Sequence, residues 1–372
     1  MYLKQLKLAN FKNYSSLDLS FCDNVNCLVG DNGVGKTNLL DAIYYLSFCK
    51  SYFNPIDSQN ILYGEDFFAI HGSYLSPDEE KSSASCIFRN GQKQMKWNGK
   101  NCRTLAEHIG HLPLVMVSPS DQQLITGGSE IRRKFIDGVI SQTDNEYLNH
   151  LLNYQKAVDQ RNTLLKQFYE NRSFDESLLA LWDEQLVAHG EYIYTRRSAF
   201  LKAFTPVFER YFKWIVSDKE SPQMVYKPQI EPSTFREALI QNRPNDRYSQ
   251  HTQVGPHKDD IELDIANHSV KRYGSQGQQK TLLLSLKLAQ FEYIYNYCHT
   301  KPILLLDDIF DKLDMPRIKQ LMALVAGDNF GQVFITDTQP GRVVAIFDEM
   351  KSVAVSVFTV ANGEVSPLKH LK

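Results

Sequence analysis

The sequence lacks the features that would place the protein in a membrane or outside the cell. Its 372 residues contain no uncharged apolar run that approaches the roughly 18 residues of a membrane span. The N-terminal stretch MYLKQLKLANFKNY alternates like a strand and does not resemble the apolar core of a signal peptide. We therefore expect a cytoplasmic protein with no membrane partner.

Paired cysteines are also missing. The six cysteines form neither a CxxC pair nor a His/Cys cluster with zinc spacing, and they stand at positions 22, 27, 49, 86, 102 and 298. In a cytoplasmic protein this usage predicts reduced thiols that serve packing. No structural metal is expected.

The protein has no excess of one charge sign, since 41 Lys and Arg oppose 43 Asp and Glu. A net charge of −2 argues against a constitutive, strongly basic nucleic-acid binder. Any contact with DNA would be a local patch that depends on salt. What the sequence does contain is 42% hydrophobic residues, enough over this length to bury a core in two or three domains.

A glycine-rich loop is the first motif that indicates chemistry. Residues 25–38, VNCLVGDNGVGKTN, place G-x-x-x-x-G-K-T between a strand pattern and a helix pattern. The glycines let backbone N–H groups turn toward a phosphate, and the helix N-terminus adds partial positive charge. Lys36 is predicted to reach the β/γ oxygens and Thr37 to ligate Mg²⁺. The predicted ATP-binding residues are Gly30, Asp31, Asn32, Gly33, Val34, Gly35, Lys36 and Thr37.

A second apolar run ends in two acids. Residues 302–314, PILLLDDIFDKLD, have the pattern of a parallel strand buried on both faces, and ligands gather at the carboxyl end of such strands. Asp307 is predicted to hold Mg²⁺ through its water shell, and Asp308 to orient or deprotonate the attacking water. Lys36 and Asp307 lie 271 positions apart (307 − 36), so a whole domain must be inserted between the halves of one nucleotide site.

Residues 272–285, RYGSQGQQKTLLLS, begin a helix pattern with unusually polar and flexible residues. Ser275 and Gln278 fit a capping box at the helix N-terminus. The cap explains neither Gly274 nor Gly277, since each glycine weakens a helix start by about 1 kcal/mol relative to Ala. We therefore expect another group to approach this backbone closely.

Together these motifs resemble the RecF family of bacterial recombination mediators, SMC-like members of the ABC ATPases. The stretch GSQGQ is similar to the LSGGQ signature, in which a helix N-terminus faces the γ-phosphate of ATP bound by another subunit. The resemblance implies that Ser275, Gly277 and Gln278 form this trans signature. It covers nearly the whole sequence and rests on LANFKNY (8–14), GDNGVGKTN (30–38), SPSDQQLITGGSEIRRKFID (118–137), QVGPHKDDIEL (253–263), YGSQGQQKT (273–281), LLLDDIFDKLD (304–314) and GQVFITDT (331–338).

The resemblance implies an ATP-dependent homodimer that binds double-stranded and gapped DNA. It also implies cooperation with RecR and RecO in loading RecA, and roles in DNA repair, replication-fork maintenance and the SOS response. Weak, DNA-dependent ATP hydrolysis would serve release. The sequence departs from the usual family pattern in two places: Asp311-Lys312 replaces Ser-Glu, and Lys258 replaces Arg. Asp308 stands where general ABC ATPases have Glu, as is usual in this family.

We predict an α/β protein with an ABC/SMC-like P-loop ATPase head, assembled from N- and C-terminal parts around an inserted helical arm. The expected limits are residues 1–118 and 249–372 for the head and 119–248 for the arm. Asn90-Gly91 and Asn98-Gly99 predict hairpins in the first part. Apolar residues at spacings of three and four predict helices from about residue 120 to 240.

Other functions stay open at this stage. The ATPase subunit of an ABC transporter shares the nucleotide motifs, but would lack the insertion and usually has a His near Thr336-Asp337-Thr338. Another SMC-like DNA-processing ATPase is a further alternative, and a nuclease would need a carboxylate-rich metal site that the sequence does not show.

Three clusters have a structural interpretation, and two of them also have a functional one. The basic run 132–134 predicts either a solvated helix face or a DNA or regulatory contact. His257 with Asp259 and Asp260 is consistent with a turn that caps a strand. Lys12 and Asn13 either edge the first strand or, by their place in the family's opening motif, contact nucleotide.

Overall fold

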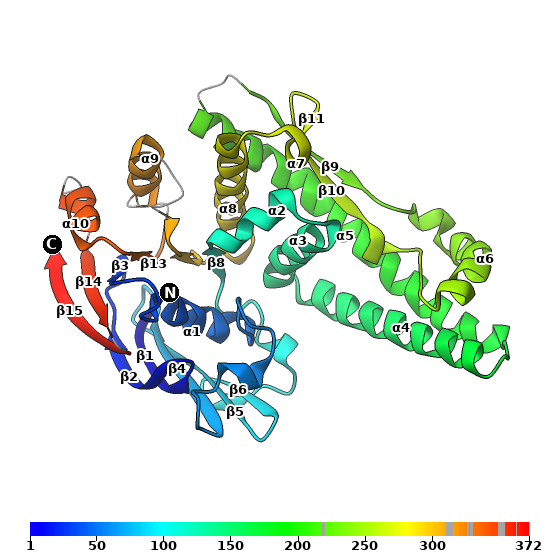
Figure 1. Ribbon diagram of the computed structural model, residues 1–372, viewed down its shortest axis with the longest axis horizontal. Helices are drawn as coiled ribbons and strands as arrows, with labels where there is room; N and C mark the ends of the chain where they lie inside the picture. The colour runs from blue at the N-terminus through cyan, green and yellow to red at the C-terminus, as the bar shows by residue number, and fades with distance from the viewer. Residues whose placement is uncertain are drawn as a thin grey trace. The chain divides into compact units, whose positions relative to one another are not determined.

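The computed structural model describes residues 1–216, 220–309, 315–325, 327, 330–348, 354–361 and 363–371 (Figure 1). The protein divides into two compact units. Unit 1 comprises Met1–Asp121 and Leu286–Lys372, and unit 2 comprises Gln122–Ser285. Within the described ranges, no helix has the length and apolar character needed to cross a bilayer.

A largely parallel sheet forms the centre of unit 1, in the order β15-β14-β3-β13-β12-β8. Its strands are β3 (Val25–Val29), β8 (Leu114–Val117), β12 (Ile303–Leu306), β13 (Val333–Asp337), β14 (Val355–Ala361) and β15 (Glu364–Leu371). Only the edge strand β15 runs antiparallel. Because their neighbours run parallel, β3, β12 and β13 all end at the same edge of the sheet. The residues of these three strands are buried throughout, as the apolar runs predict.

A second, antiparallel sheet of unit 1 has the order β2-β1-β4-β5-β6-β7. Its strands are β1 (Tyr2–Phe11), β2 (Tyr14–Ser20), β4 (Phe67–Leu75), β5 (Lys81–Arg89), β6 (Gln92–Trp97) and β7 (Lys100–Asn101). Positive φ angles at Asn90, Gly91, Asn98 and Gly99 form the two predicted hairpin turns. Helix α1 (Lys36–Phe48) shares a hydrophobic core with both sheets.

The remaining described elements of unit 1 are short. They are η1 (Asp57–Asn60), η2 (Leu105–Glu107), α9 (Met315–Val325) and α10 (Pro340–Asp348), and η3 (Pro119–Gln122) reaches the unit boundary. The six cysteines are free thiols, and Cys27, Cys49 and Cys86 are buried. This burial agrees with the packing role that the sequence predicts.

Unit 2 is mainly helical, as the sequence predicts, and its long helices α4 and α5 lie side by side (Figure 1). The helices are α2 (Gln123–Thr126), α3 (Ser129–Thr143), α4 (Asn145–Glu170), α5 (Glu176–Val216), α6 (Pro232–Ser249), η4 (Pro256–Lys258) and α7 (Val270–Tyr273). A small sheet has the order β11-β10-β9, with β9 (Pro222–Lys227), β10 (Asp260–Ile265) and β11 (His268–Ser269). Helix α8 (Gln276–Cys298) begins in unit 2 and ends in unit 1.

The boundaries of the compact units differ from the predicted domain limits mainly on the C-terminal side. The first break follows Asp121, close to the predicted limit at 118, whereas the second follows Ser285 and not residue 248. The reason is strand pairing: β10 pairs with β9 from Asp260↔Lys227 to Ile265↔Pro222, which ties this segment to the helical unit. The assignment of the segments to an ATPase head and an arm stays a prediction.

Candidate functional site

The glycine-rich loop leaves the buried strand β3 and enters α1, the predicted order of strand, loop and helix. Gly35 has φ +112, and a Cβ at this position would lie 2.4 Å from Asn13 Nδ2 and 2.9 Å from the Tyr14 hydroxyl. The positive φ therefore favours glycine, and a Cβ would in addition displace the side chains of Asn13 and Tyr14 from the loop. The Tyr14 hydroxyl donates to the Gly35 carbonyl at 3.0 Å, and Asn13 Nδ2 donates to the Val34 carbonyl at 3.2 Å. The turn between β1 and β2 thus supports the loop.

Lys36 is buried at the start of α1 and folds back over the loop. Its Nζ donates to the carbonyls of Gly30 and Asp31, both at 2.8 Å. Asp31, Asn32 and Gly33 are exposed. The loop therefore presents an accessible rim and places one ammonium group beneath it.

Asp307 follows β12 and meets residues from two other elements. Thr37 of α1 and Thr336 of β13 each donate a hydroxyl hydrogen bond to Asp307 Oδ1, both at 2.9 Å. Burial raises the pKa of Asp307, while these two hydrogen bonds act in the opposite direction. The structure thus brings together the two predicted metal-binding residues across 270 positions of sequence.

Asp308 adopts a left-handed backbone conformation, with φ +45, which is uncommon for a residue other than glycine. Its backbone N–H donates to Thr336 Oγ1 at 2.8 Å. Its side-chain Oδ1 is buried without a hydrogen-bond partner in the part of the protein that the structure describes. A buried acceptor left unpaired costs about 1–3 kcal/mol, so strain and unused hydrogen-bonding capacity coincide at this position.

Lys12 and Asn13 have different environments, although they are adjacent. Lys12 Nζ pairs at 2.5 Å with the buried carboxylate of Asp41, which also accepts hydrogen bonds from Ser51 Oγ and the Tyr52 N–H. Asn13 contacts the phosphate loop directly, as described above. Lys12 therefore anchors α1, and Asn13 supports the loop.

The predicted capping box at the start of α8 is confirmed within unit 2. The Gln278 N–H donates to Ser275 Oγ at 3.2 Å, and the Ser275 N–H donates to Gln278 Oε1 at 2.8 Å. A Cβ on Gly274 would lie 2.6 Å from the Val270 carbonyl oxygen. Gly274 therefore has a local explanation in the turn of α7, and the expected approach of an outside group is not needed to account for it.

The motif around His257 forms a buried polar turn in unit 2. His257 Nδ1 lies 2.7 Å from the Tyr154 hydroxyl, and Nε2 lies 3.0 Å from the Thr252 carbonyl oxygen. Burial lowers the pKa of His257 to about 4. Asp259 accepts hydrogen bonds from Arg197 and the Tyr226 hydroxyl. These contacts favour the interpretation of this motif as a turn next to strand β10.

The basic run in α3 is mostly used inside unit 2. Arg132 binds the carboxylate of Asp260 with two hydrogen bonds of 2.9 Å, and Arg133 donates to the Asp259 carbonyl at 2.6 Å. Only Lys134 lies in solvent, paired with Glu130. The interpretation of all three as a solvated helix face is therefore wrong.

Sequence reasoning missed two fully buried arginines of unit 2. Arg161 pairs with Asp183 and Asp246, and Arg197 pairs with Asp137 and Asp259. In the sequence both arginines stand among polar residues of a helix pattern, as they would on a solvent-exposed face. The sequence therefore does not indicate that their side chains are buried. Residues 311–314, where the sequence departs from the family pattern, lie outside the described residues.

A phosphate-type loop and an acid-terminated parallel strand that meet through Thr37 and Asp307 define a P-loop nucleotide-binding protein of the α/β class. Comparison with known proteins narrows this class. The profile described as "RecF/RecN/SMC N terminal domain" matches residues 2–364. The curated "DNA replication and repair protein RecF" of Phocaeicola vulgatus is 45% identical over 373 residues, covering all of both proteins. The chain belongs to the RecF family.

Solved structures agree with this assignment. A structure described as "Structure of the recombination mediator protein RecF-ATP in RecFOR pathway" matches with a TM-score of 0.90 at 31% identity, covering 99% of this protein and 98% of that one. An Smc head bound to a domain of ScpA matches with a TM-score of 0.57 at 17% identity, over 99% and 98% of the two proteins, and shows the fold alone. The predicted family and the predicted ABC/SMC-like fold class are therefore confirmed.

Proposed function

We propose that this protein is an ATP-dependent DNA-binding protein of recombinational repair and replication-fork maintenance. In this proposal it dimerises on ATP, binds duplex and gapped DNA, and helps RecR and RecO to load RecA. The observation that carries the proposal is the 2.9 Å contact between Thr37 and Asp307, made in a protein that matches a RecF–ATP structure over 99% of its length. A DNA partner of this kind would place the protein in the cytoplasm.

The phosphate groups of ATP would lie in the loop formed by residues 30–37. Backbone N–H groups of the loop and the N-terminus of α1 would bind the phosphate oxygens. Lys36 would exchange the carbonyl oxygens of Gly30 and Asp31 for β/γ oxygens, because its ammonium group already lies at the loop. Because the Lys36 ammonium group would have to move only a short way, we propose Lys36 as the principal positive charge at the site.

Thr37 and Asp307 have the chemistry that Mg²⁺ requires. The Thr37 hydroxyl donates a hydrogen bond to Asp307, and the lone pairs of the hydroxyl oxygen are then available as hard donors for the ion. Asp307 would hold the ion through its water shell. When bound, Mg²⁺ would neutralise charge on the phosphates.

Asp308 is proposed to orient or deprotonate the attacking water. Its unpaired Oδ1 supports this role, because a buried carboxylate oxygen with free hydrogen-bonding capacity is suited to a water molecule. Hydrolysis would be slow and would serve the release of DNA. In this scheme ATP acts as a switch.

The signature residues Ser275, Gly277 and Gln278 are proposed to act in trans. The capping box fixes the first turn of α8, and Ser275 is exposed. A helix N-terminus of this kind suits an anion. In a twofold dimer, each ATP would then lie between the loop of one subunit and the signature of the other.

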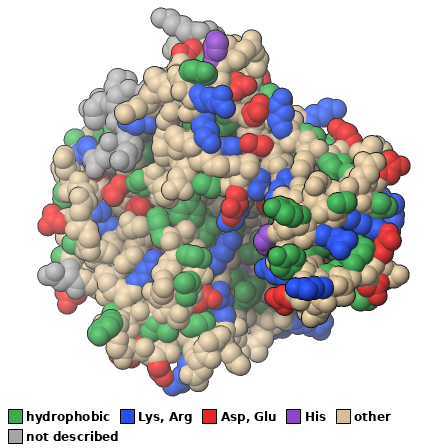
Figure 2. Space-filling view, turned by 45° about the vertical axis from the view of Figure 1, so that its right-hand side comes forward, with side chains coloured by type: hydrophobic (Ala, Val, Ile, Leu, Met, Phe, Trp, Pro, Cys, Tyr) green, Lys and Arg blue, Asp and Glu red, His purple; other side chains and the backbone are tan. Residues whose placement is uncertain are grey.

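Binding of DNA would use local patches. Figure 2 shows Lys and Arg side chains intermixed with Asp and Glu over the visible face, in keeping with a net charge of −2. A few phosphate contacts formed in the ATP-bound dimer would make DNA binding conditional on nucleotide and sensitive to salt.

The test is the affinity of the protein for duplex and gapped DNA with and without ATP, at one fixed ionic strength. Lys36→Ala should weaken ATP binding about 10- to 150-fold, the value of one hydrogen bond to a charged group, and should abolish the gain in DNA affinity with ATP. Lys7→Ala is the matched control, because Lys7 is a half-exposed lysine of β1 that pairs with Asp18 and lies outside the loop. Unchanged ATP binding and DNA retention in Lys36→Ala would refute the site.

A further inference from the structure

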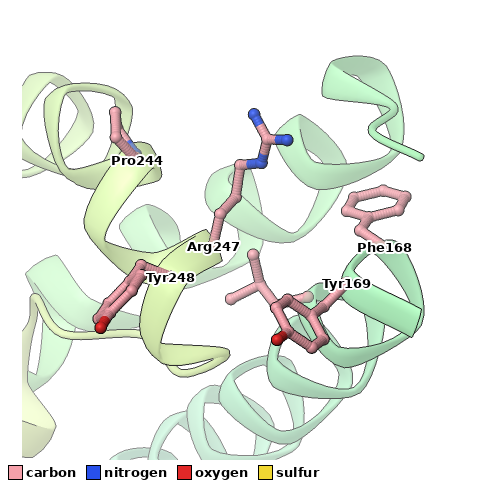
Figure 3. Close-up of a pocket in the computed structure, with 6 residues that line it drawn as sticks. Phe168, Tyr169, Pro244, Arg247 and Tyr248 are labelled. Carbon is pink, nitrogen blue, oxygen red and sulfur yellow. The ribbon is translucent and has the colours of Figure 1, made fainter. Parts of the chain in front are cut away.

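A cavity of about 280 Å³ lies between α4 and α6 of unit 2. Its lining is Leu165, Phe168 and Tyr169 from α4 with Pro244, Arg247 and Tyr248 from α6. In the view of Figure 3, Arg247 lies between Pro244 and Phe168, and Tyr248 and Tyr169 lie below it on either side. The proposed nucleotide chemistry uses none of these residues.

The walls of the cavity combine a buried floor with an exposed aromatic rim. Leu165 and Phe168 are 1% and 8% exposed, whereas Tyr169 is 63% and Tyr248 is 89% exposed. Exposed tyrosines offer a large amphipathic contact area at a low cost in conformational entropy. The cavity is therefore suited to an apolar group that enters from solvent.

Arg247 differs from the other arginines of α6. Arg236 pairs with Glu184, and Arg243 pairs with Glu176 and Asp183. Among the residues that the structure describes, no carboxylate pairs with Arg247. Its guanidinium instead lies 4.2 Å from the centre of the Phe174 ring.

This cation–π contact does not use the hydrogen-bonding capacity of Arg247. A guanidinium has five N–H donors, and among the described residues none of those of Arg247 is paired with a carboxylate. Such a group matches a carboxylate in a bidentate arrangement. The cavity thus has one anion-binding group beside an apolar pocket.

The surrounding charges decide which class of ligand fits. Near the end of α4 and the start of α5, Lys166 and Arg172 alternate with Glu170 and Asp175. A nucleic acid requires several unpaired cations along its backbone, and this surface has no excess of them. A single carboxylate next to an apolar side chain requires only Arg247.

We propose that this cavity binds a short segment of a partner protein. The segment inserts one aromatic or branched apolar side chain between Tyr169 and Tyr248. It places one carboxylate, from Asp, Glu or the terminal carboxyl group of the partner, on Arg247. The site lies wholly in unit 2 and requires neither ATP nor DNA. This proposal can therefore be tested independently of the proposed nucleotide site.

The test uses two small probes on the full-length protein without nucleotide: phenylpropionate, which has a ring and a carboxylate, and its neutral amide, phenylpropionamide. Ligand-observed NMR titration gives the two dissociation constants. We expect the acid to bind about tenfold or more tightly than the amide, as one charged hydrogen-bonded pair provides. Equal binding of acid and amide, or no binding of either, would overturn the proposal.

Two variants assign the preference to the cavity. Arg247→Gln should bind acid and amide equally, whereas Arg236→Gln should keep the tenfold preference as the matched control on the same helix. Tyr248→Ser should weaken the binding of both probes. Because Tyr248 is highly exposed, this variant should keep the melting temperature of the wild type, which thermal denaturation checks. An Arg247→Gln protein that still binds phenylpropionate more tightly than phenylpropionamide would contradict the proposal. A short oligothymidylate that displaces phenylpropionate from the wild type, but not from Tyr248→Ser, would show that the cavity binds nucleic acid and would contradict it as well.

Discussion

Asp307 is held in surroundings that disfavour its ionised form. Burial raises its pKa, and the hydrogen bonds from Thr336 and Thr37 offset only part of that effect. An acid whose pKa is raised by folding destabilises the folded state at pH values above that pKa, and this cost is relieved as the pH falls through it. The proposed metal-binding role of Asp307 thus conflicts with the stability of the nucleotide-free protein.

We therefore expect Asp307→Asn to raise the melting temperature of the nucleotide-free protein at neutral pH. The expected gain in the free energy of unfolding is about 0.5–2 kcal/mol. The amide oxygen still accepts hydrogen bonds from both threonines, and the buried charge is gone. The same variant should lose the stabilisation that ATP with Mg²⁺ gives to the wild type. Thermal denaturation with and without MgATP measures both effects.

Asp121→Asn is the control for this prediction, because Asp121 is a buried carboxylate that holds Lys287 Nζ at 2.9 Å. Removing its charge leaves a buried cation poorly compensated, so this variant should melt at a lower temperature. If Asp307→Asn also melts lower without ligand, Asp307 has a structural role and the conflict proposed here does not exist.

At the residue scale, the sequence was informative where neighbours in sequence are neighbours in the site. The eight loop residues are consecutive, and so their geometry could be predicted from a local motif. The burial of Arg161 could not be predicted in this way, since it depends on Asp183 and Asp246, which belong to other helices and lie far away in the sequence. Asp308 lies between these cases: its position was predicted, but its left-handed backbone was not.

At the scale of elements, the turn η4 makes the stability of unit 2 depend on pH. Burial and the nearby charges of Lys258, Arg133 and Arg161 lower the pKa of His257 from 6.5 to about 4. Between these values the unfolded protein binds a proton that the folded protein does not. Stability is therefore fully present above about pH 6.5 and is lost as the pH falls toward 4.

We predict that acidification over this range costs unit 2 roughly 3 kcal/mol through His257, and that His257→Gln removes this share of the loss. Urea denaturation of both proteins at neutral and acid pH gives the comparison. His108 of unit 1 also has its pKa lowered to about 4, so the variant should keep a pH dependence that originates there. An identical pH dependence in both proteins would show that His257 is not the group that titrates.

Elements that are determined by adjacent residues could be predicted, whereas elements that need a partner distant in sequence could not. The capping box at Ser275 and the hairpin turns at Asn90 and Asn98 depend on adjacent residues, and all three are confirmed. Strand β9 was missed inside a segment predicted to be helical, because it gains its partner only when β10 pairs with it. The same pairing ties residues 260–265 to unit 2, whereas the sequence predicted that the second part of the head begins at residue 249.

At the scale of the whole molecule, the proposed composite site predicts complementation between two inactive proteins. Lys36→Ala damages the loop, and Gly277→Asp places bulk and a carboxylate in the first turn of α8, where the γ-phosphate of the other subunit would approach. Each homodimer should be inactive. A mixed dimer has both lesions in one site and an intact second site.

With random mixing and independent sites, the mixture should regain roughly a quarter of wild-type ATPase activity, since half of the dimers are mixed and each has one good site of two. Light scattering with ATP should verify that mixed dimers form. If they form and activity stays at the level of the separate variants, the signature does not act in trans, and Ser275 and Gln278 serve only as a helix cap.

The discontinuous sheet of unit 1 also has a consequence for synthesis on the ribosome. Strand β3 pairs with β13 and β14, and β8 pairs with β12, so neither finds a partner before the last 87 residues (286–372) appear. The contiguous 164 residues of unit 2 (122–285) must emerge between the two parts of unit 1, which takes roughly 8–33 s at about 5–20 residues per second. During that interval β3 and β8 of unit 1 lack their parallel partners, and their exposed apolar residues would be a binding site for a chaperone.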